Sequence, residues 1–477
     1  MYKIKSILYL IPLGICLAAA GCKIPQIVPA NENKTMPGSY GFSTDTTNSA
    51  TGDWHSFFTD KNLGSLIDTA LKNNQELKIT LQELEIAENE VQVKKGALLP
   101  AVGVKAGAGL EKVGRYTSQG AGDASTEIAP GKETPDPLGD FNIGAYANWE
   151  VDIWKKLRTA KKAALTRYLS TIEGKNFLLT NLIAEVANSY YELLALDNQL
   201  AVVKENISLQ KSAMDIVKIQ KEAARTTELA VQKFQAELYK SQSLEFEILQ
   251  KIKETENRIN LLLGRYPQEI TRDEAGFLNQ NPAVVHTGIP SQLLASRPDV
   301  KQAELELAAA KLDVKAARAE FYPSFDISAG LGFQAFKPSY LFRTPESLFY
   351  SLAGDLAAPL INRNAIKAEF KSASARQLQA MYNYERTVLN AYLEVSTSLS
   401  SISNLEKNYD LKTRQVDALN KSIEASNDLF RSARVDYFEV LMTQRDALEA
   451  KLELIETKKD QLSAVTLIYR NVGGGWR

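Results

Sequence analysis

Two kinds of hydrophobic pattern alternate along the chain. After Pro100, and again after Pro323, apolar residues alternate with small or polar residues, which is the period of a β-strand. Elsewhere, apolar residues recur every three or four positions over long stretches, which is typical of α-helices that pack along a seam. The change from the helical to the strand period falls at a proline, which ends a helix and favours an extended chain. The pattern predicts a chain in which helices and short strands follow one another.

Four segments have the strand period, at about 100–116, 140–152, 323–337 and 347–359. In the first, Val102, Val104, Ala106, Ala108 and Leu110 form an apolar face, and glycine and lysine alternate with them. Strands of about 9–11 residues with one apolar face are typical of transmembrane β-strands. A pair of β-hairpins in a soluble domain, packed on a core, is the alternative.

The opposite face of these segments favours the membrane interpretation. It is rich in glycine, serine and charged residues, which suits a water-filled lumen, and the loop at 116–139 has the composition of a long extracellular loop. Four strands cannot close a barrel, and lipid does not tolerate an open sheet edge. Strands that span a membrane would therefore require several copies of the chain to share one barrel.

Long stretches without proline predict helices of unusual length. Residues 155–222 contain Gly174 as their single glycine, and residues 365–430 contain neither proline nor glycine. At about 1.5 Å per residue, each stretch would form a helix about 100 Å long. Short turns at 223–227 and 432–437 follow, and a second helix returns from each turn. Further helices are expected at 63–97 and 300–320.

The chain contains this arrangement twice, which indicates two homologous halves. Aligning Leu99-Pro100 with Tyr322-Pro323 places Gly107-Ala108-Gly109 against Gly330-Leu331-Gly332. The halves also end alike, at Leu263-Gly264 and Val472-Gly473. We expect a signal peptide at 1–21, an extended segment at 22–62, a first repeat at 63–264, a linker at 265–290, a second repeat at 291–472 and a tail at 473–477.

The N-terminus is predicted to be a secretion signal that ends at a lipidated cysteine. Lys3 and Lys5 precede the apolar run Ile7–Ala20, which is short for a membrane-spanning helix. Ala19-Ala20-Gly21 then precede Cys22, which resembles the bacterial lipobox and predicts acylation of Cys22. Ordinary signal cleavage beside an incidental cysteine is the alternative.

Composition and charge exclude several other classes of function. The 56 Lys and Arg against 57 Asp and Glu give a net charge of −1, which disfavours nucleic-acid binding by phosphate neutralisation. His55 and His286 have no metal-ligand partner at the next helical turn, so we expect no metal site. Phosphate-binding and dinucleotide-binding glycine motifs are missing from the sequence. We therefore expect neither catalytic residues nor a cofactor.

Several motifs together resemble a known family. They are Trp149-Glu150-Val151-Asp152-Ile153-Trp154, Ser296-Arg297-Pro298-Asp299-Val300, Ala353–Leu360 and Gly473-Gly474-Gly475-Trp476. With the predicted lipid-modified cysteine and the duplicated architecture, they resemble the TolC-like outer-membrane efflux factors, in the NodT-type lipoprotein branch that serves resistance-nodulation-division pumps. The resemblance implies an α+β membrane protein. Its homotrimer would form a twelve-stranded outer-membrane β-barrel, four strands per chain, continued by a long periplasmic α-helical barrel.

The resemblance also implies a function and partners. The chain would be a passive, lipid-anchored conduit in the outer membrane of a Gram-negative bacterium, extending into the periplasm. It would export small molecules such as drugs, toxic compounds or metal ions. A periplasmic adaptor protein and an inner-membrane resistance-nodulation-division pump would complete the tripartite system. Two alternatives remain open, a type I protein secretion outlet of the same fold and a structural coiled-coil lipoprotein without a pore.

A periplasmic gate is implied where the second long helix turns back. The family's pattern falls on residues 430–434 and 437–442, and two aspartates are common in the second of these stretches. Here Glu439 is acidic and Met442 is not. We expect three Glu439 carboxylates near the pore axis to repel one another and to favour cations. An ordinary solvated helix charge is the alternative.

Other residues of the turns complete this prediction. Arg434 and Asp436 are expected to hold the turn closed through ion pairs or hydrogen bonds. Because Met442 replaces the second acid, a single acidic ring is expected. The first repeat departs from the family's pattern as well, with Leu229-Ala230-Val231 at a place where some members have an acid. Ala224 and Ala433 occupy positions where the family's turns have glycine.

Overall fold

The structure is a computed structural model that describes residues 24–27, 31–32, 35–40, 47, 52–273, 276–359, 363–432 and 434–476. Cys22, for which lipidation is predicted, lies outside the described residues. Among the helices of the described ranges, none is long and apolar enough to cross a lipid bilayer. The chain divides into two compact units.

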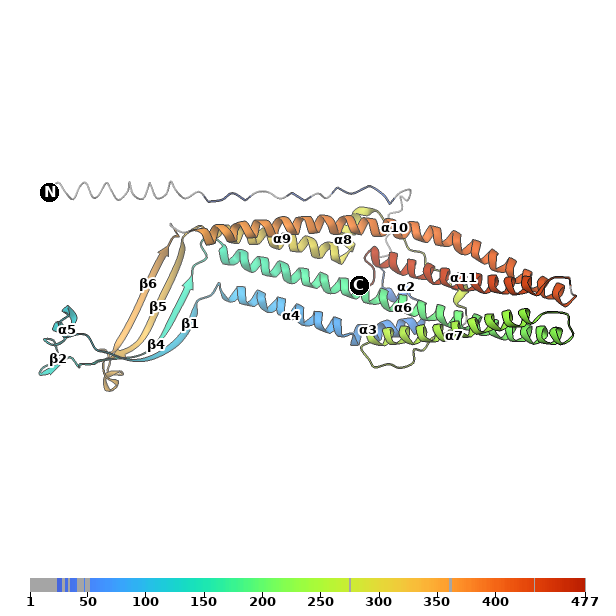
Figure 1. Cartoon of the computed structure of the whole chain (residues 1–477). Helices are drawn as coiled ribbons and strands as arrows, with labels where there is room; N and C mark the ends of the chain where they lie inside the picture. The colour runs from blue at the N-terminus through green and yellow to red at the C-terminus, as the bar shows by residue number, and fades with distance from the viewer. Residues whose placement is uncertain are drawn as a thin grey trace. The chain divides into compact units, whose positions relative to one another are not determined.

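The first unit contains a four-stranded antiparallel sheet, and its residues are 1–31, 85–169 and 305–382 (Figure 1). The strands are β1 (Ala101–Glu111), β4 (Leu138–Glu150), β5 (Ser324–Ala335) and β6 (Leu348–Ala357), in the spatial order β1-β4-β5-β6. The first repeat therefore meets the second where β4 pairs with β5. Strands β1 and β6 form the two edges of this sheet.

The connection between β1 and β4 contains small elements in addition to the expected loop. Helix α5 (Ser118–Asp123) is capped by Thr117, whose hydroxyl accepts a hydrogen bond of 3.1 Å from the Gly120 amide. Strands β2 (Glu127–Ala129) and β3 (Lys132–Glu133) form a short hairpin after it. The connection between β5 and β6 contains the 3-10 helix η4 (Pro338–Tyr340).

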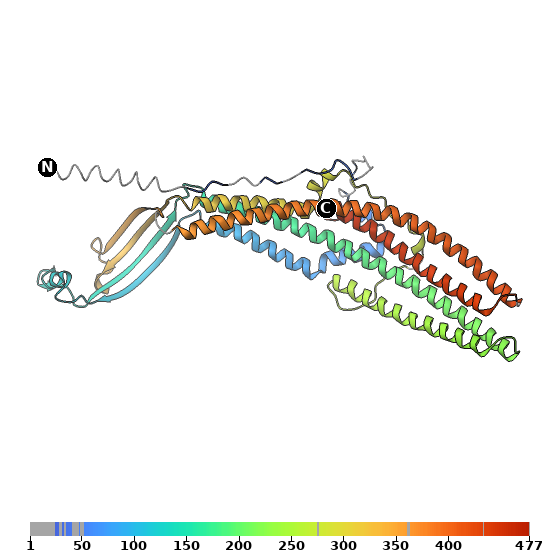
Figure 2. The same cartoon turned by 45° about the horizontal axis from the view of Figure 1, so that its top comes forward.

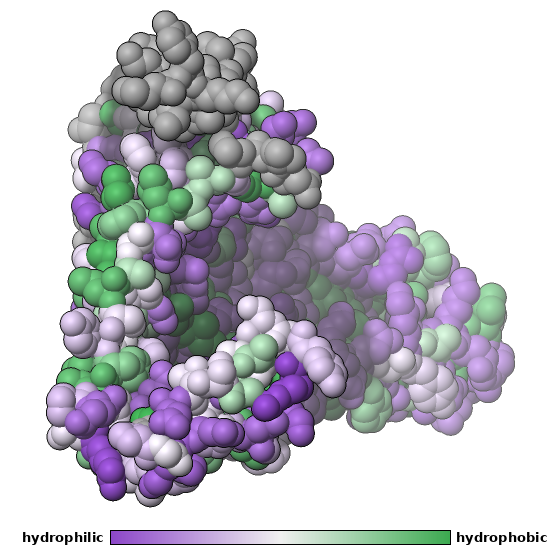
Figure 3. Space-filling view, turned by 90° about the vertical axis from the view of Figure 1, so that its left-hand side faces the viewer, coloured by the Kyte–Doolittle hydropathy of each residue, from purple (hydrophilic) through white to green (hydrophobic). Residues whose placement is uncertain are grey.

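Strand register separates an apolar face from a polar face across the whole sheet. Val104 lies opposite Ala145, Ala145 opposite Leu331, and Leu331 opposite Tyr350. On the other face, Glu150, Asp326 and Asp355 form a row across β4, β5 and β6. In the space-filling view, hydrophobic side chains gather along one margin of the part nearest the viewer (Figure 3). The predicted alternation of small or polar and apolar positions is confirmed.

Helical segments continue the first unit beyond the strands. The first unit contains part of each of four helices: α4 (Gln75–Gly96), α6 (Lys156–Glu222), α9 (Pro298–Ala319) and α10 (Asn364–Arg431). Val314 and Ala317 of α9 pack with Phe321 against Phe370 of α10. Near the N-terminus, Ile24 and Ile27 pack against the same cluster. This small core fixes α9 and α10 where they join β5 and β6.

The second unit is helical and contains residues 32–84, 170–304 and 383–477. It includes the remaining parts of α4, α6, α9 and α10, together with α2 (Trp54–Phe57), α3 (Lys61–Asn73), α7 (Glu228–Leu262), α8 (Leu293–Ser296), α11 (Tyr437–Asn471) and the 3-10 helices η2 (Phe277–Asn279) and η3 (Pro290–Gln292). Helix α7 returns alongside α6, and α11 returns alongside α10 (Figure 2). The long helices are confirmed, since α6 has 67 residues and α10 has 68. A core that includes Leu63, Tyr190, Leu193 and Ile259 joins α3, α6 and α7.

The expectation of one helix over 63–97 is wrong, because Asn74 separates α3 from α4. Its backbone leaves the helical conformation, with φ −54° and ψ 129°. The Asn74 carboxamide oxygen accepts from the Leu77 amide at 2.9 Å, and its nitrogen donates to the Leu262 carbonyl at 2.9 Å. The side chain therefore caps α4 and holds the end of α7. At the aligned position of the second repeat, Arg297 lies between α8 and α9.

Candidate functional site

The Trp149–Trp154 motif forms the junction between β4 and α6. The Asp152 carboxylate is buried and accepts hydrogen bonds of 2.9 Å from the amides of Leu157 and Arg158, so it caps the first turn of α6. Lys155 has a φ of 61°, which turns the chain from the strand into the helix.

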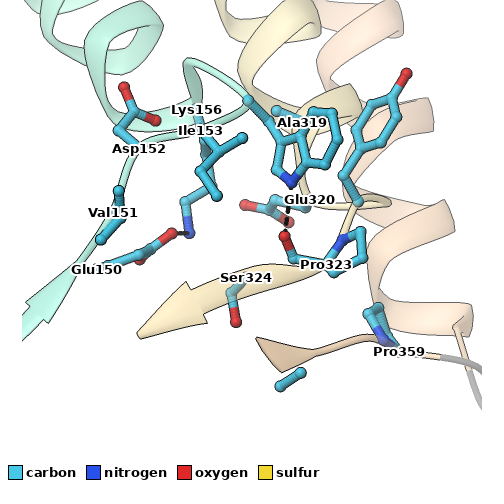
Figure 4. A pocket seen from close by; sticks show the side chains of 13 residues that line it. Glu150, Val151, Asp152, Ile153, Lys156, Ala319, Glu320, Pro323, Ser324 and Pro359 are labelled. Carbon is cyan, nitrogen blue, oxygen red and sulfur yellow. Dashed lines mark hydrogen bonds and ion pairs between the residues drawn. The ribbon is translucent and has the colours of Figure 1, made fainter. Parts of the chain in front are cut away.

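This junction also joins the two repeats. The Trp154 indole nitrogen donates to the Pro323 carbonyl at 2.7 Å, and its ring stacks on Tyr322 with centroids 4.8 Å apart. The Lys156 ammonium forms an ion pair with Glu150 beside the cavity shown in Figure 4. Contacts from the β4–α6 loop to the α9–β5 loop therefore fix the ends of adjacent strands.

The tip of the first helical hairpin is a tight turn between α6 and α7. Ala224 has a φ of 56°, a left-handed conformation that glycine adopts more readily, and the Arg225 amide donates to the Gln220 carbonyl at 2.8 Å. Glu228 opens α7, where a hydrogen bond from Gln232 and an ion pair with Lys221 lower the pKa of its carboxyl. The turn is thus formed without a glycine at its left-handed position.

The tips of the two hairpins pack against each other. Val217 and Phe234 of the first hairpin form a cluster with Phe430, Tyr437 and Leu441 of the second. In addition, the Lys233 ammonium lies 5.1 Å from the centre of the Phe438 ring. A displacement of one tip must therefore disrupt an apolar contact with the other.

The structure places the predicted gate residues together at the second tip. Asp436 is the residue before α11, Glu439 lies in its first turn, and Arg434 precedes both. All three are exposed. In the part of this turn that the structure describes, no ion pair joins Arg434 to Asp436 or Glu439 within one chain. Ala433 lies outside the described residues.

Arg297 lies at the centre of a buried polar network that is not evident from the sequence. Its guanidinium donates to both Asp299 carboxylate oxygens, at 2.9 and 2.6 Å, and to a Glu394 carboxylate oxygen at 2.7 Å. It also donates to the Asn471 carbonyl at 3.0 Å, near the end of α11. The Ser-Arg-Pro-Asp-Val motif identified the residue, but its partners on α10 and α11 are distant in the sequence.

Among the described residues, no group of three or more His, Cys, Asp or Glu side chains is arranged to hold a metal ion. His55 is exposed and lies between Asp53 and Asp68, with nitrogen–oxygen distances of 3.0 and 3.5 Å. A hydrogen bond with Asp53 raises the pKa of His55. These contacts are local to the start of α2 and to α3.

Known proteins match nearly the whole chain. Pyoverdine export outer membrane protein OpmQ of Pseudomonas aeruginosa is 28% identical over 425 residues, which cover 89% of this chain and 87% of that protein. The probable outer membrane lipoprotein SilC of Salmonella typhimurium is 26% identical, with all of both chains covered. The structure of the open state of the Neisseria gonorrhoeae MtrE outer membrane channel superposes with a TM-score of 0.80 at 20% identity, covering 96% of this chain and 99% of that one.

The α+β fold deduced above is thus shared with a solved outer-membrane channel. A family model described as outer membrane efflux protein matches residues 66–265 and 289–474, one match in each repeat. The chain therefore belongs to the outer membrane efflux protein family.

Proposed function

We propose that three copies of this chain form an outer-membrane channel through which an efflux system exports small molecules. The observation that carries the proposal is a sheet with one apolar face and two open edges. On the edge strands, Val104 is 79% exposed and Tyr350 is 82% exposed in the single chain. Because lipid offers no hydrogen bonds to an open strand edge, β6 of one chain must pair with β1 of the next. Three four-stranded sheets then close a twelve-stranded barrel.

The chain acts as a passive conduit in this proposal. The polar face of the sheet lines the lumen, and the long helices extend the passage into the periplasm. Transport energy comes from an inner-membrane resistance-nodulation-division pump, and a periplasmic adaptor protein joins the pump to the channel. The chain itself carries out no catalysis and needs no cofactor.

Small molecules are the proposed class of substrate because the relatives are named for different small cargoes. Besides pyoverdine export, they include the cation efflux protein CusC of Escherichia coli and a toluene efflux protein of Pseudomonas putida. Since the same fold serves such different cargoes, we propose that the pump rather than this chain makes the first selection.

The oligomer and its conductance test the proposal directly. The mature protein, extracted in detergent, should be a heat-resistant trimer and should give stable conductance steps in a planar bilayer. A monomeric, water-soluble mature protein would contradict the proposal, and so would a trimer that gives no conductance.

We further propose that Glu439 forms a ring of negative charge in the periplasmic constriction. Its exposure at the hairpin tip supports this role. Replacing Glu439 by glutamine should lower the ratio of cation to anion permeability about two- to fivefold, because three carboxylates are lost from one narrow ring. Reversal potentials in a salt gradient measure the ratio. Glu449→Gln, a matched charge change on the same helix, should leave it unchanged; an equal effect of both variants would refute the assignment.

Arg434 and Asp436 are proposed to hold the gate closed by pairing between neighbouring chains. Their exposure supports this, as does the finding that the described turn contains no ion pair between them within one chain. Asp436→Asn should therefore raise the fraction of time that the channel spends open. A closed fraction equal to that of the unmodified protein would argue against the pairing.

Acylation of Cys22 is proposed as the membrane anchor. Ile24 packs beside the junction of α9 and α10 with the strands, and Cys22 precedes it by two residues in the sequence. A lipid at that position would enter the leaflet that borders the periplasm. Mass spectrometry of the N-terminal peptide should detect a diacylglyceryl cysteine with an amide-linked acyl chain, and an unmodified peptide that begins elsewhere would exclude it.

A further inference from the structure

Two aromatic rings lie against glycine backbone on the polar face of the sheet. A Cβ atom built on Gly330 would lie 3.2 Å from a ring carbon of Tyr146. Cβ atoms on Gly144 and Gly332 would lie 3.1 and 2.9 Å from ring carbons of Phe349. The rings therefore occupy part of the space that side chains would fill at these positions, together with backbone atoms of the neighbouring strand at Gly144 and Gly332 and with the Ser351 hydroxyl at Gly330. We call Tyr146 and Phe349 the aromatic shelf.

The rings of the shelf are close enough to act on one solute. Their centroids are 6.0 Å apart and their planes are inclined by 35°. Tyr146 and Phe349 are each half-buried, whereas every other residue of β6 is exposed. Since one side of each ring contacts the sheet, the other side faces away from it.

The shelf shares its face with all the charged residues of the four strands. Strand register and alternation place them there: Lys105, Glu111, Asp140, Glu150, Asp326 and Asp355. Carboxylates outnumber the single lysine on this face. Toward the helical end of the strands, Glu150, Asp326 and Asp355 form one row, and the Lys156 ammonium is the counter-charge to Glu150.

We propose that the aromatic shelf is a contact surface for aromatic cations that pass through the channel. This inference rests on the proposed function, which makes the polar face the wall of the lumen. The carboxylates attract any cation, but they do not distinguish a flat aromatic cation from an aliphatic one. The ring faces of Tyr146 and Phe349 distinguish the two kinds of cation. A planar aromatic cation can stack on these rings, and the ring quadrupole attracts its positive charge. Three shelves line the lumen of the trimer.

A purely structural role for the same rings leads to a different expectation. Aromatic side chains that cover glycine stabilise strands by filling space above an exposed backbone. Leucine also fills space over glycine, but it has no π-face. Replacement by leucine therefore separates recognition of the solute from packing of the sheet.

Block of the channel by two cations tests the inference. The full-length trimer is placed in a planar bilayer, and ethidium, a flat aromatic cation, is compared with tetrabutylammonium, an aliphatic cation. In the unmodified channel, ethidium should block for longer than tetrabutylammonium at equal concentration. In the double variant Tyr146→Leu, Phe349→Leu, the residence time of ethidium should fall about three- to tenfold, that of tetrabutylammonium should stay the same, and the potassium chloride conductance should persist.

A matched control lies on the opposite face of the sheet. Phe333→Leu removes an aromatic ring from the apolar face of β5 and should leave both residence times unchanged. Equal block by the two cations in the unmodified channel would overturn the inference, and so would an equal change for both cations in the double variant. If the double variant does not assemble, Phe349→Trp should lengthen ethidium block, and an unchanged or shorter block would overturn the inference. Lack of any conductance in the unmodified trimer would instead contradict the proposed function.

Discussion

Replacing Leu352 by arginine should prevent assembly of the trimer in the outer membrane. Leu352 is in the middle of β6, on the apolar face opposite Ala329, and it is 80% exposed in the single chain. In the proposed barrel, this face contacts lipid. An arginine near the bilayer midplane costs about 2–4 kcal/mol, and the trimer carries the cost three times. The amount of heat-resistant trimer in the outer-membrane fraction measures the effect.

The next residue of the same strand provides the matched control. Ala353 lies opposite Ser328 on the polar face, so Ala353→Arg places the same side chain in the water-filled lumen. This variant should assemble nearly as well as the unmodified protein and should conduct cations less well. If Ala353→Arg abolished assembly while Leu352→Arg did not, the two faces would be assigned the wrong way round. Equal trimer yields from both variants would argue against strands that span a bilayer.

Replacing Arg297 by alanine should give the largest loss of stability in the helical unit. The Arg297 side chain is 6% exposed and the Asp299 side chain is 17% exposed. Removing the guanidinium therefore leaves the largely buried Asp299 carboxylate without a counter-charge. Breaking a buried pair in this way typically costs about 3–5 kcal/mol. The Asn471 carbonyl also loses its donor. Thermal unfolding of the trimer, followed by circular dichroism, should show a clearly lower midpoint.

Two further variants separate the effect of the buried Arg297 pairing from the effect of losing any arginine. Arg297→Lys keeps the charge but loses the planar fork that binds Asp299 through two nitrogens, so its midpoint should lie between those of the alanine variant and the unmodified protein. Arg376→Ala breaks an exposed pair with Glu369 and should cost less than about 1 kcal/mol. Similar midpoints for Arg297→Ala and Arg376→Ala would show that the network contributes little to stability.

The long helices and the strands were predictable because their periodicity is a local property of the sequence. Residues 365–430 contain no helix breaker, and α10 includes all of them. The break at Asn74 was not predictable in this way, because asparagine is tolerated within helices. It ends α3 here through contacts with Leu77 and with the distant Leu262 carbonyl.

Contacts between distant segments account for what the sequence analysis missed in the candidate site. The position of Glu439 at a hairpin tip follows from the helix boundary, and the structure agrees with it. The packing of Phe234 against Phe430 and Tyr437 required knowledge of how the hairpins lie side by side. Pairing of Arg297 with Glu394 likewise depends on tertiary structure. The proposed gate would depend on contacts between neighbouring chains, which the local sequence of one chain does not specify.

The pairing of β4 with β5 has a consequence for how this assembly arose. Within a chain it joins two homologous hairpins, as the proposed pairing of β6 with β1 joins two chains. Six copies of an ancestral single repeat would therefore close the same twelve-stranded barrel, with the same strand pairing between each copy and the next. A duplication would have placed every second one of these strand pairings within a single chain, so that the two halves could diverge. The neutral Asn74 and the charged Arg297, at aligned positions, record that divergence.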